Sequence, residues 1–270
     1  MDLSSFTWIN ETNLALNISL QFGSTSHLCG SKSNYDIQFE KCLSLQYGDY
    51  KHEIELLERR NEASGLALNE SHLWITGGVD LNGKNVLATE FVSSLEVSPG
   101  PDLPTPIKGH CMILVKADLV ALISPDKLLY LNLTSGFWSI NSNRTLETND
   151  FACGRILADS SESLMLVVGG QNQQDQPSKL VKIGLLTSDD WTSGPNLPEP
   201  LTNLALVSFE TFALTIGGKT GFDQNHVQNV YKFSCCLNFG CSWSMLNVKL
   251  PFVSSTSILA FTLEDSLMPK

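Results

Sequence analysis

Short runs of apolar and β-branched residues, each ending in two glycines, recur along the chain. Three of them occupy residues 73–78, 164–170 and 212–218. A run of this length and composition predicts a buried β-strand, and the glycines allow the backbone to turn where a side chain would clash. The glycine pairs to which we assign this structural role are Gly77, Gly78, Gly169, Gly170, Gly217 and Gly218.

The runs are evenly spaced, which indicates an internal repeat. Gly78 and Gly170 lie 92 positions apart, twice 46, and Gly218 follows 48 positions later. This period predicts a further copy near residue 124, where the apolar run 119–124 ends in Ile123-Ser124. One period before Gly78, the segment 27–30 ends in Gly30 and is a degraded copy.

Two other landmarks follow the same period. Gly-Pro-x-Leu-Pro occurs at 100–104 and 194–198, and Leu-Pro recurs at 250–251. Tryptophans stand just ahead of these turn regions at spacings of 53 and 52 residues. A large aromatic residue once per repeat favours packing between adjacent repeats. The residues concerned are Trp138, Trp191 and Trp243.

Each repeat reads as four short strands separated by turn residues. Within one repeat we predict strands near 63–68, 73–76, 89–92 and 95–97. The next repeat gives strands near 111–115, 119–123, 128–132 and 137–140. Residues 50–63 have some helical periodicity, but the repeat requires a strand and a turn there, so we predict a strand.

The strand ending in Gly-Gly, the later aromatic residue, the tryptophan and the Leu-Pro turn together resemble the kelch repeat over about residues 13–262. The resemblance implies an all-β, kelch-type β-propeller, whose four-stranded blades surround a central channel. The sequence departs from the pattern in its third strands, where the expected aromatic residue is clear only at Tyr130 and Tyr231, while Phe91 and Leu180 replace it elsewhere.

We count five recognisable repeats in a single domain spanning 1–270, at 13–60, 61–104, 105–148, 149–200 and 201–251. Residues 1–12 and 252–270 are left over. Trp8 matches a last strand and 257–261 a first strand, so we expect a sixth blade closed by both termini, which removes exposed sheet edges. An incomplete sequence is the alternative explanation.

The composition of the chain limits the classes of partner that it is expected to bind. Hydrophobic residues make up 42% of the chain, enough for a sizeable core, and the formal charge is −11. Such an acidic surface repels phosphate backbones, so we expect no nucleic-acid partner. No apolar run is long enough to span a membrane, and no signal peptide is visible. We expect a monomer.

Seven cysteines and several sequons favour an extracellular, secreted glycoprotein, with a cytoplasmic protein as the alternative. Cys235 or Cys236 is expected to bridge to Cys241, and we name Cys236 as the candidate. Cys29 and Cys42 form a second candidate pair across a hairpin. Cys111 and Cys153 are either a third bridge or two buried thiols. Asn10, Asn17, Asn69, Asn132 and Asn143 fit the sequon, and Asn69, Asn132 and Asn143 are the glycosylation candidates.

No catalytic constellation is recognisable, so we expect no enzyme, no cofactor and no metal site. His52-Glu53 lacks the second histidine of a zinc-protease helix. His110-Cys111 reads as a packed histidine rather than an activated thiol, and Asp189-Asp190 reads as a solvated turn.

Resemblance to kelch domains implies protein binding through the loops that follow the glycine pairs, near 79–84, 125–127, 171–178 and 219–226. These loops are polar and unlike one another, which suits recognition grafted on a rigid scaffold. A carbohydrate- or small-ligand-binding or modifying propeller, using Arg144, Arg155 or His110, and an intracellular scaffold related to actin or ubiquitin ligases are alternatives. The candidate contact residues are Asp80, Gln171, Asn172 and Lys219.

Overall fold

The computed structural model describes twelve stretches of the chain, with side chains from Glu55 onward except those of Glu162, Asn225 and Cys236. They are residues 16–22, 25–32, 37–46, 49–60, 62–69, 72–93, 96–141, 145–158, 162–185, 190–221, 225–236 and 240–249. The chain divides into two compact units. We call the described residues up to 149 the N-terminal unit and those from 150 the C-terminal unit.

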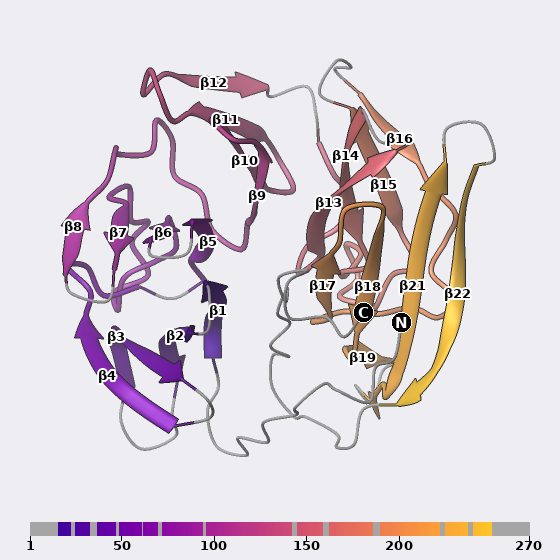
Figure 1. The fold of residues 1–270 in the computed structure, drawn as a ribbon, viewed down its shortest axis with the longest axis horizontal. Coiled ribbons are helices and arrows are strands. Elements are labelled where there is room, and N and C mark those ends of the chain that lie inside the picture. Colours follow the sequence, from indigo (N-terminus) through magenta and orange to yellow (C-terminus); the bar gives the residue numbers. More distant parts are fainter. Residues whose placement is uncertain are drawn as a thin grey trace, which may run out of the picture. The chain divides into compact units, whose positions relative to one another are not determined.

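Three four-stranded antiparallel sheets make up the N-terminal unit, and in each the strands follow one another in chain order (Figure 1). The first contains β1 (Leu16–Phe22), β2 (Thr25–Lys32), β3 (Ile37–Gln46) and β4 (Asp49–Glu55). The second contains β5 (Ser64–Asn69), β6 (His72–Thr76), β7 (Glu90–Val92) and β8 (Val97–Pro99). The third contains β9 (Cys111–Lys116), β10 (Leu119–Ile123), β11 (Leu128–Asn132) and β12 (Trp138–Asn141).

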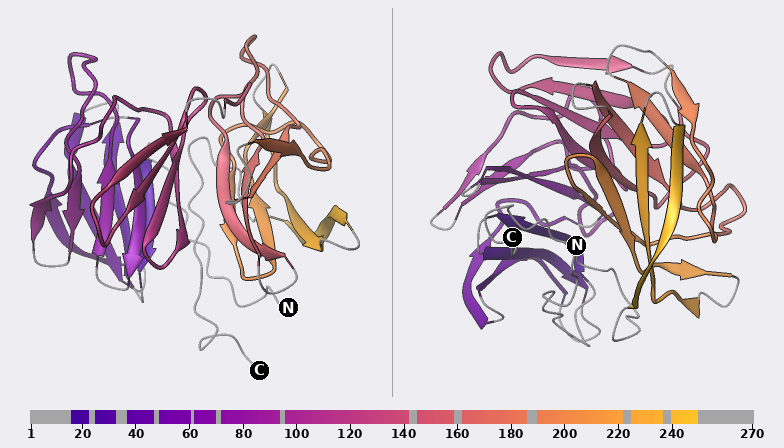
Figure 2. Two further views of the ribbon diagram at one scale, coloured as in Figure 1. Left: turned by 90° about the horizontal axis from the view of Figure 1, so that it is seen from above. Right: turned by 45° about the vertical axis from the view of Figure 1, so that its right-hand side comes forward.

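The C-terminal unit repeats this arrangement in two further sheets (Figure 2). The fourth sheet contains β13 (Ala152–Ala158), β14 (Glu162–Val168), β15 (Val181–Leu185) and β16 (Trp191–Ser193). The fifth contains β17 (Ala205–Ser208), β18 (Phe212–Ile216), β21 (Asn229–Cys236) and β22 (Gly240–Lys249). A small hairpin of β19 (Lys219–Thr220) and β20 (Asn225–His226) is inserted between β18 and β21.

The all-β prediction is confirmed for the described residues, whose regular elements are all strands. In each of the two repeats whose strands we predicted one by one, four strands occur near the predicted positions. Most strand ends are shifted by one or two residues. The segment predicted as a strand over 50–63 is one only as far as Glu55. A four-stranded antiparallel meander is the form of a propeller blade, so the sheets are compatible with a propeller-like fold. Trp8 and residues 257–261 lie outside the described residues.

All three glycine pairs adopt the left-handed conformation that glycine alone reaches without strain. In the fourth sheet, φ is +68° at Gly169 and +95° at Gly170. A Cβ atom on Gly169 would lie 2.5 Å from the carbonyl oxygen of Leu201. The pair therefore lets the end of β14 pass close to the segment that leads to the fifth sheet.

The third sheet needs no glycine pair because its second and third strands are joined by a tight turn. The backbone N–H of Ser124 donates to the carbonyl of Lys127 at 3.0 Å, and the Ser124 hydroxyl donates to Asp126 at 2.7 Å. A serine at the glycine position thus closes the hairpin directly.

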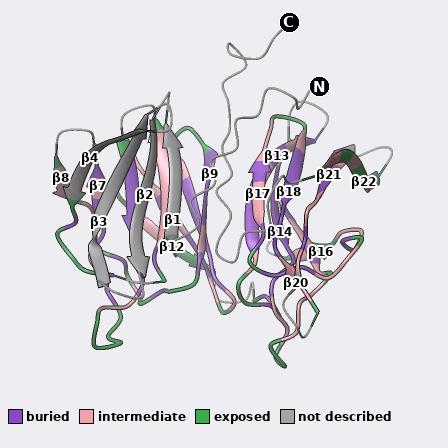
Figure 3. Cartoon of the chain, turned by 90° about the horizontal axis from the view of Figure 1, so that it is seen from below, coloured by how far each residue is buried: buried purple, intermediate pink, exposed green. Residues whose placement is uncertain are grey.

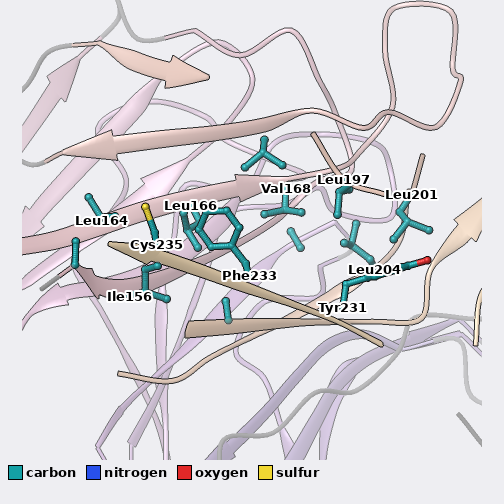
Figure 4. Close-up of a cluster of buried hydrophobic side chains, with 14 of the residues drawn as sticks. Ile156, Leu164, Leu166, Val168, Leu197, Leu201, Leu204, Tyr231, Phe233 and Cys235 are labelled. Carbon is teal, nitrogen blue, oxygen red and sulfur yellow. The ribbon is translucent and has the colours of Figure 1, made fainter. Parts of the chain in front are cut away.

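Apolar side chains of neighbouring sheets pack against one another within each unit. In the N-terminal unit, Trp74 of β6 lies 6.0 Å from Trp138 of β12, ring centre to ring centre, in one buried cluster. In the C-terminal unit, strands of the fourth and fifth sheets share a core that includes Ile156, Leu166 and Phe233 (Figure 4). In the four sheets whose burial is described, the second strand (β6, β10, β14 or β18) is the most buried (Figure 3).

Trp243 packs against Phe233 within the fifth sheet and forms a hydrogen bond to the turn that follows the fourth sheet. Its ring centre lies 4.9 Å from that of Phe233, and its Nε1–H donates to the carbonyl of Pro195 at 2.9 Å. Pro195 belongs to the Gly-Pro-x-Leu-Pro turn, whose Leu197 is buried. Trp191, the first residue of β16, is half-buried.

Candidate functional site

Three loops that follow the glycine pairs share one backbone frame, and we call them the rim loops: residues 79–85, 171–177 and 219–226. Each begins with a short antiparallel bridge, Val79 to Asn85 and Gln171 to Pro177 in the first two, and Lys219 to His226 in the third. The residue after each loop donates its N–H to the carbonyl of the second glycine at 2.9 Å in all three cases. The loops are therefore closed at their base by the same bonds.

Asp80 and Asn172 occupy equivalent positions and hold the first two rim loops in shape. Oδ1 of Asp80 accepts from the backbone N–H groups of Asn82 and Lys84, both at 2.8 Å. Oδ1 of Asn172 accepts in the same way from Gln174 and Gln176, at 2.9 and 3.0 Å. The hydrogen bond from the Lys84 backbone lowers the pKa of Asp80, which stabilises the carboxylate. These two oxygens define the turns.

The tips of the first two rim loops are the exposed parts. Residues 81–85 are all exposed, and Leu81 exposes 53% of its surface although it is apolar. Residues 173–175 are exposed in the second loop. The first tip is therefore partly apolar and the second is polar, on nearly the same frame.

In the third rim loop, Lys219 and His226 face each other on β19 and β20, and both are half-buried. Partial burial, followed by the charge of Lys219, lowers the pKa of His226. The backbone of Lys219 also exchanges two hydrogen bonds with Thr202, at 2.8 and 3.0 Å. Lys219 thus connects its loop to the segment that enters the fifth sheet.

The four candidate contact residues come from both units. Asp80 lies in the N-terminal unit, whereas Gln171, Asn172 and Lys219 lie in the C-terminal unit. Gln171 and Asn172 are half-buried neighbours at the base of one loop. Each loop is therefore a separate candidate contact surface.

A buried ion pair beneath the first rim loop could not be anticipated from the sequence. Arg60 and Glu90 are each 1% exposed, and their side chains form a direct ion pair. Nη1 of Arg60 also donates to the carbonyls of Gly77 and Ala88, at 3.3 and 2.8 Å. Gly77 precedes the loop and Ala88 follows it, so one guanidinium fixes both ends.

The carboxylate of Glu90 also accepts hydrogen bonds from the backbone. It accepts from the backbone N–H groups of Leu57 and Glu58, at 2.7 and 3.1 Å. Burial lowers the pKa of Arg60, and the charge of Glu90 opposes this shift. No sequence spacing marks the pair, because its members lie 30 residues apart on a linker and a third strand.

A second polar cluster lies where β21 begins. The Tyr231 hydroxyl donates to Glu199, and Nδ2 of Asn229 donates to the same carboxylate at 3.0 Å. Burial, with the adjacent Glu199, raises the pKa of Tyr231 to about 12. The phenol therefore stays protonated at neutral pH and ties β21 to the segment before the fifth sheet.

His110, considered above as part of a thiol site, is a packed side chain. Its Nε2 lies 2.7 Å from Oγ1 of Thr76, whose hydroxyl donates to the sulfur of Met112. Burial lowers the pKa of His110 to about 3, so the imidazole is neutral. Cys111 is disulfide-bonded and offers no thiolate for the histidine to activate.

The prediction that Cys236 bonds to Cys241 is wrong. Cys241 is bonded to Cys235 and not to Cys236. The register of β21 and β22 places Cys235 directly opposite Cys241, with Cα atoms 4.0 Å apart, and pairs Cys236 with Gly240. Successive residues of a strand point to opposite faces, so only one of two adjacent cysteines can meet the partner.

The other candidate cysteines lie in strands. Cys29 stands opposite Cys42 in the register of β2 and β3, and their side chains lie outside the described residues. Cys111 and Cys153 are each disulfide-bonded, which removes the alternative of two free thiols. That they pair with each other stays a prediction.

The remaining residues singled out from the sequence are the glycosylation candidates and two arginines. Asn69 is the exposed last residue of β5, and Asn132 is the half-buried last residue of β11. Asn143 and Arg144 lie outside the described residues. Nε of Arg155 donates to Ser163 at 3.1 Å.

Within the described stretches, no three of the His, Cys, Asp and Glu side chains are grouped in a way that could hold a metal ion. The same stretches contain no helix with the length and hydropathy needed to cross a bilayer. The sequence matches no protein-family model and no curated protein.

Proposed function

We propose that this chain is a divergent kelch-type β-propeller that acts without catalysis, by binding a protein partner through its rim loops. The observation that supports this most is the shared frame of the first two rim loops under different tips. Both have seven residues, the same basal bridge and the same side-chain brace at Asp80 and Asn172. A fixed frame that carries variable tips suits recognition, because little conformational entropy is lost on binding.

Contacts are proposed to come from the loop tips, with the four candidate residues at the base. Asp80 and Asn172 use their oxygens to hold the loops, so their proposed contribution is to present the tips. Leu81 and Lys84 in the first loop and Gln173 in the second are exposed beside them. An exposed apolar side chain with polar neighbours fits the apolar core and polar rim of a protein-binding surface.

An extracellular setting is part of the proposal. The Cys235–Cys241 bond favours an oxidising compartment, where such bonds persist. We also propose that the sheets are blades of a ring completed by a sixth blade from both chain ends, as the repeat count suggests.

Exchange of loop tips tests the proposal. Residues 81–84 are replaced with the sequence of residues 173–176, which should keep the frame because the bracing bonds are equivalent. The purified protein is screened as a multivalent probe against secreted proteins, cell-surface ectodomains and glycans. We expect a protein ligand whose affinity falls by about tenfold or more on the exchange.

Met245→Ser provides the matched control, since Met245 is 66% exposed on β22 and belongs to none of the rim loops. Affinity should be unchanged in this variant. A protein ligand that binds equally well after residues 81–84 and residues 173–176 have both been replaced would contradict the proposal. Binding to glycans alone would support the carbohydrate alternative.

A further inference from the structure

Phe137 is the most exposed large hydrophobic side chain among the described residues, at 78% of its surface. It lies in the turn between β11 and β12, next to Trp138, which is half-buried and packs against the core. Phe137 has no ring contact with another aromatic residue or a cation within the described stretches. A single exposed apolar side chain is ordinary on a protein surface, so the significance of Phe137 depends on the residue that lies across the hairpin from it.

Asn132 lies directly across this hairpin from Phe137. Its backbone N–H donates to the Phe137 carbonyl at 3.1 Å, which continues the register in which Leu131 faces Trp138. Residues opposite each other on paired strands have Cβ atoms about 4.5–5.5 Å apart and point to the same face. Gly136, with φ of +71°, donates its N–H to the Asn132 carbonyl at 2.8 Å, so the hairpin closes through a glycine bulge. We infer from the register that the side chains of Asn132 and Phe137 lie on the same face of the hairpin.

Asn132 begins the sequence Asn-Leu-Thr, which fits the N-glycosylation acceptor pattern. Its Oδ1 accepts from the N–H and the hydroxyl of Ser135, at 2.8 and 3.0 Å. Its Nδ2 lies 3.3 Å from Oδ2 of the exposed Asp118. An asparagine linked to a sugar keeps one hydrogen on Nδ2, so the contact with Asp118 is compatible with the modification.

We propose that Asn132 carries an N-linked glycan whose first N-acetylglucosamine packs on the ring of Phe137. In the attachment step, Nδ2 of Asn132 bonds to the anomeric carbon of an oligosaccharide carried on a lipid pyrophosphate. The bond from that carbon to the pyrophosphate oxygen breaks, the lipid pyrophosphate leaves with the electron pair, and Nδ2 loses one proton. This inference is independent of the rim loops and requires passage through the secretory pathway.

The sugar and the ring are chemically complementary. One face of the pyranose presents C–H groups, and the face of a phenyl ring carries partial negative charge. The linkage already holds the sugar beside the ring, so little further entropy is lost when the two pack together. The glycan would thereby remove an exposed apolar surface that no other described side chain covers.

The test uses the full chain, secreted from cells that make high-mannose glycans. Glycopeptide mass spectrometry measures occupancy of Asn132. Four proteins, with and without Thr134→Ala and with and without Phe137→Ser, form a double-mutant cycle in melting temperature. We expect Thr134→Ala to lower Tm by about 2 °C or more when Phe137 is present and to have no effect with Phe137→Ser.

A direct readout follows from trimming the glycan to its first sugar with an endoglycosidase. The trimmed protein should keep its Tm, and its N-acetylglucosamine protons should shift upfield in NMR spectra through the ring current of Phe137. Asn69→Gln, which removes a sequon on another hairpin, is the control and should leave this shift unchanged.

An unoccupied Asn132 in the secreted protein would overturn the proposal. Equal effects of Thr134→Ala with and without Phe137, or proton shifts unaffected by Phe137→Ser, would overturn the packing of sugar on ring. Partner binding through the rim loops is measured separately with Thr134→Ala and should be unchanged, so failure here would not affect the proposed binding through these loops.

Discussion

Arg60 and Glu90 form an ion pair that is almost completely buried, and it connects the segment before β5 to both ends of the first rim loop. A buried pair of this kind contributes little net stability compared with apolar side chains of the same size, but loss of one member leaves the other charged and unpaired. The evident structural effect of the pair is to hold the first rim loop in one geometry.

Glu90→Ala should therefore lower the free energy of unfolding of the N-terminal unit by about 3–5 kcal/mol, measured by urea denaturation. Arg60→Met combined with Glu90→Leu should recover only part of that loss, because no charge remains buried but the backbone groups that the pair satisfied lose their partners. The control is the exposed pair of Lys108 and Glu62, whose atoms lie 3.1 Å apart. Lys108→Ala should change stability by less than about 1 kcal/mol, and an equal effect in both pairs would refute the argument.

His110 should make stability depend on pH. Its pKa in the folded protein is about 3, because burial disfavours the charged form, while an unfolded histidine titrates near 6.5. Between these values the unfolded chain binds a proton that the folded chain does not. The contribution is thus fully present above about pH 6.5 and is lost progressively as the pH falls toward 3, by up to about 1.4 kcal/mol per pH unit.

The measurement is urea denaturation at several pH values between 4 and 7, repeated for His110→Gln. The variant should show a shallower dependence over this range, whatever its absolute stability. His72→Gln, at an exposed position on β6, is the control and should keep the slope of the parent protein. Identical slopes for His110→Gln and the parent would contradict the prediction.

Peptide mapping under non-reducing conditions should recover Cys235 linked to Cys241. Their sequence separation is 6, so the chain-entropy estimate for loss of the bond in Cys241→Ser is about 2 kcal/mol. Cys236→Ser should leave the bond and the stability unchanged. Recovery of a Cys236–Cys241 peptide as the main species would show that the register of β21 and β22 differs from the one described.

Gly169→Ala and Gly221→Ala separate close packing from backbone strain. Both glycines have positive φ, +68° and +71°. A Cβ atom at Gly221 would have no neighbour within 4 Å, so only strain of about 1–2 kcal/mol is expected. At Gly169 the Cβ would also clash with the Leu201 carbonyl, which adds about 1–3 kcal/mol. Thermal denaturation of both variants checks the order, and equal losses would show that the close approach is unimportant.

The strands were predictable because their signals are local. Residues 119–123 and 128–132 are strands as predicted, since short apolar runs between turn residues favour an extended, buried backbone whatever lies beyond them. The glycine pairs were predictable for the same reason. Short outer strands were placed less well: the segment predicted at 95–97 is observed at Val97–Pro99, because few buried residues mark its register.

The candidate site was predictable in position but not in chemistry. The rim loops follow the glycine pairs, as the repeat indicates, yet the sequence does not reveal that Asp80 and Asn172 brace them through two backbone N–H groups each. The side-chain oxygen of an aspartate in a polar loop can accept from its own turn or face solvent, and only the folded backbone distinguishes the two.

The sequence by itself determined the period, the strands and the turns that need glycine, since these depend on the alternation of side chains and on backbone sterics over a few residues. Only the tertiary structure decided that Arg60 meets Glu90, that Cys235 rather than Cys236 meets Cys241, and that Asn132 faces Phe137. Each of these contacts depends on strand register or on segments distant in the chain. A shift of one residue would turn every side chain to the opposite face.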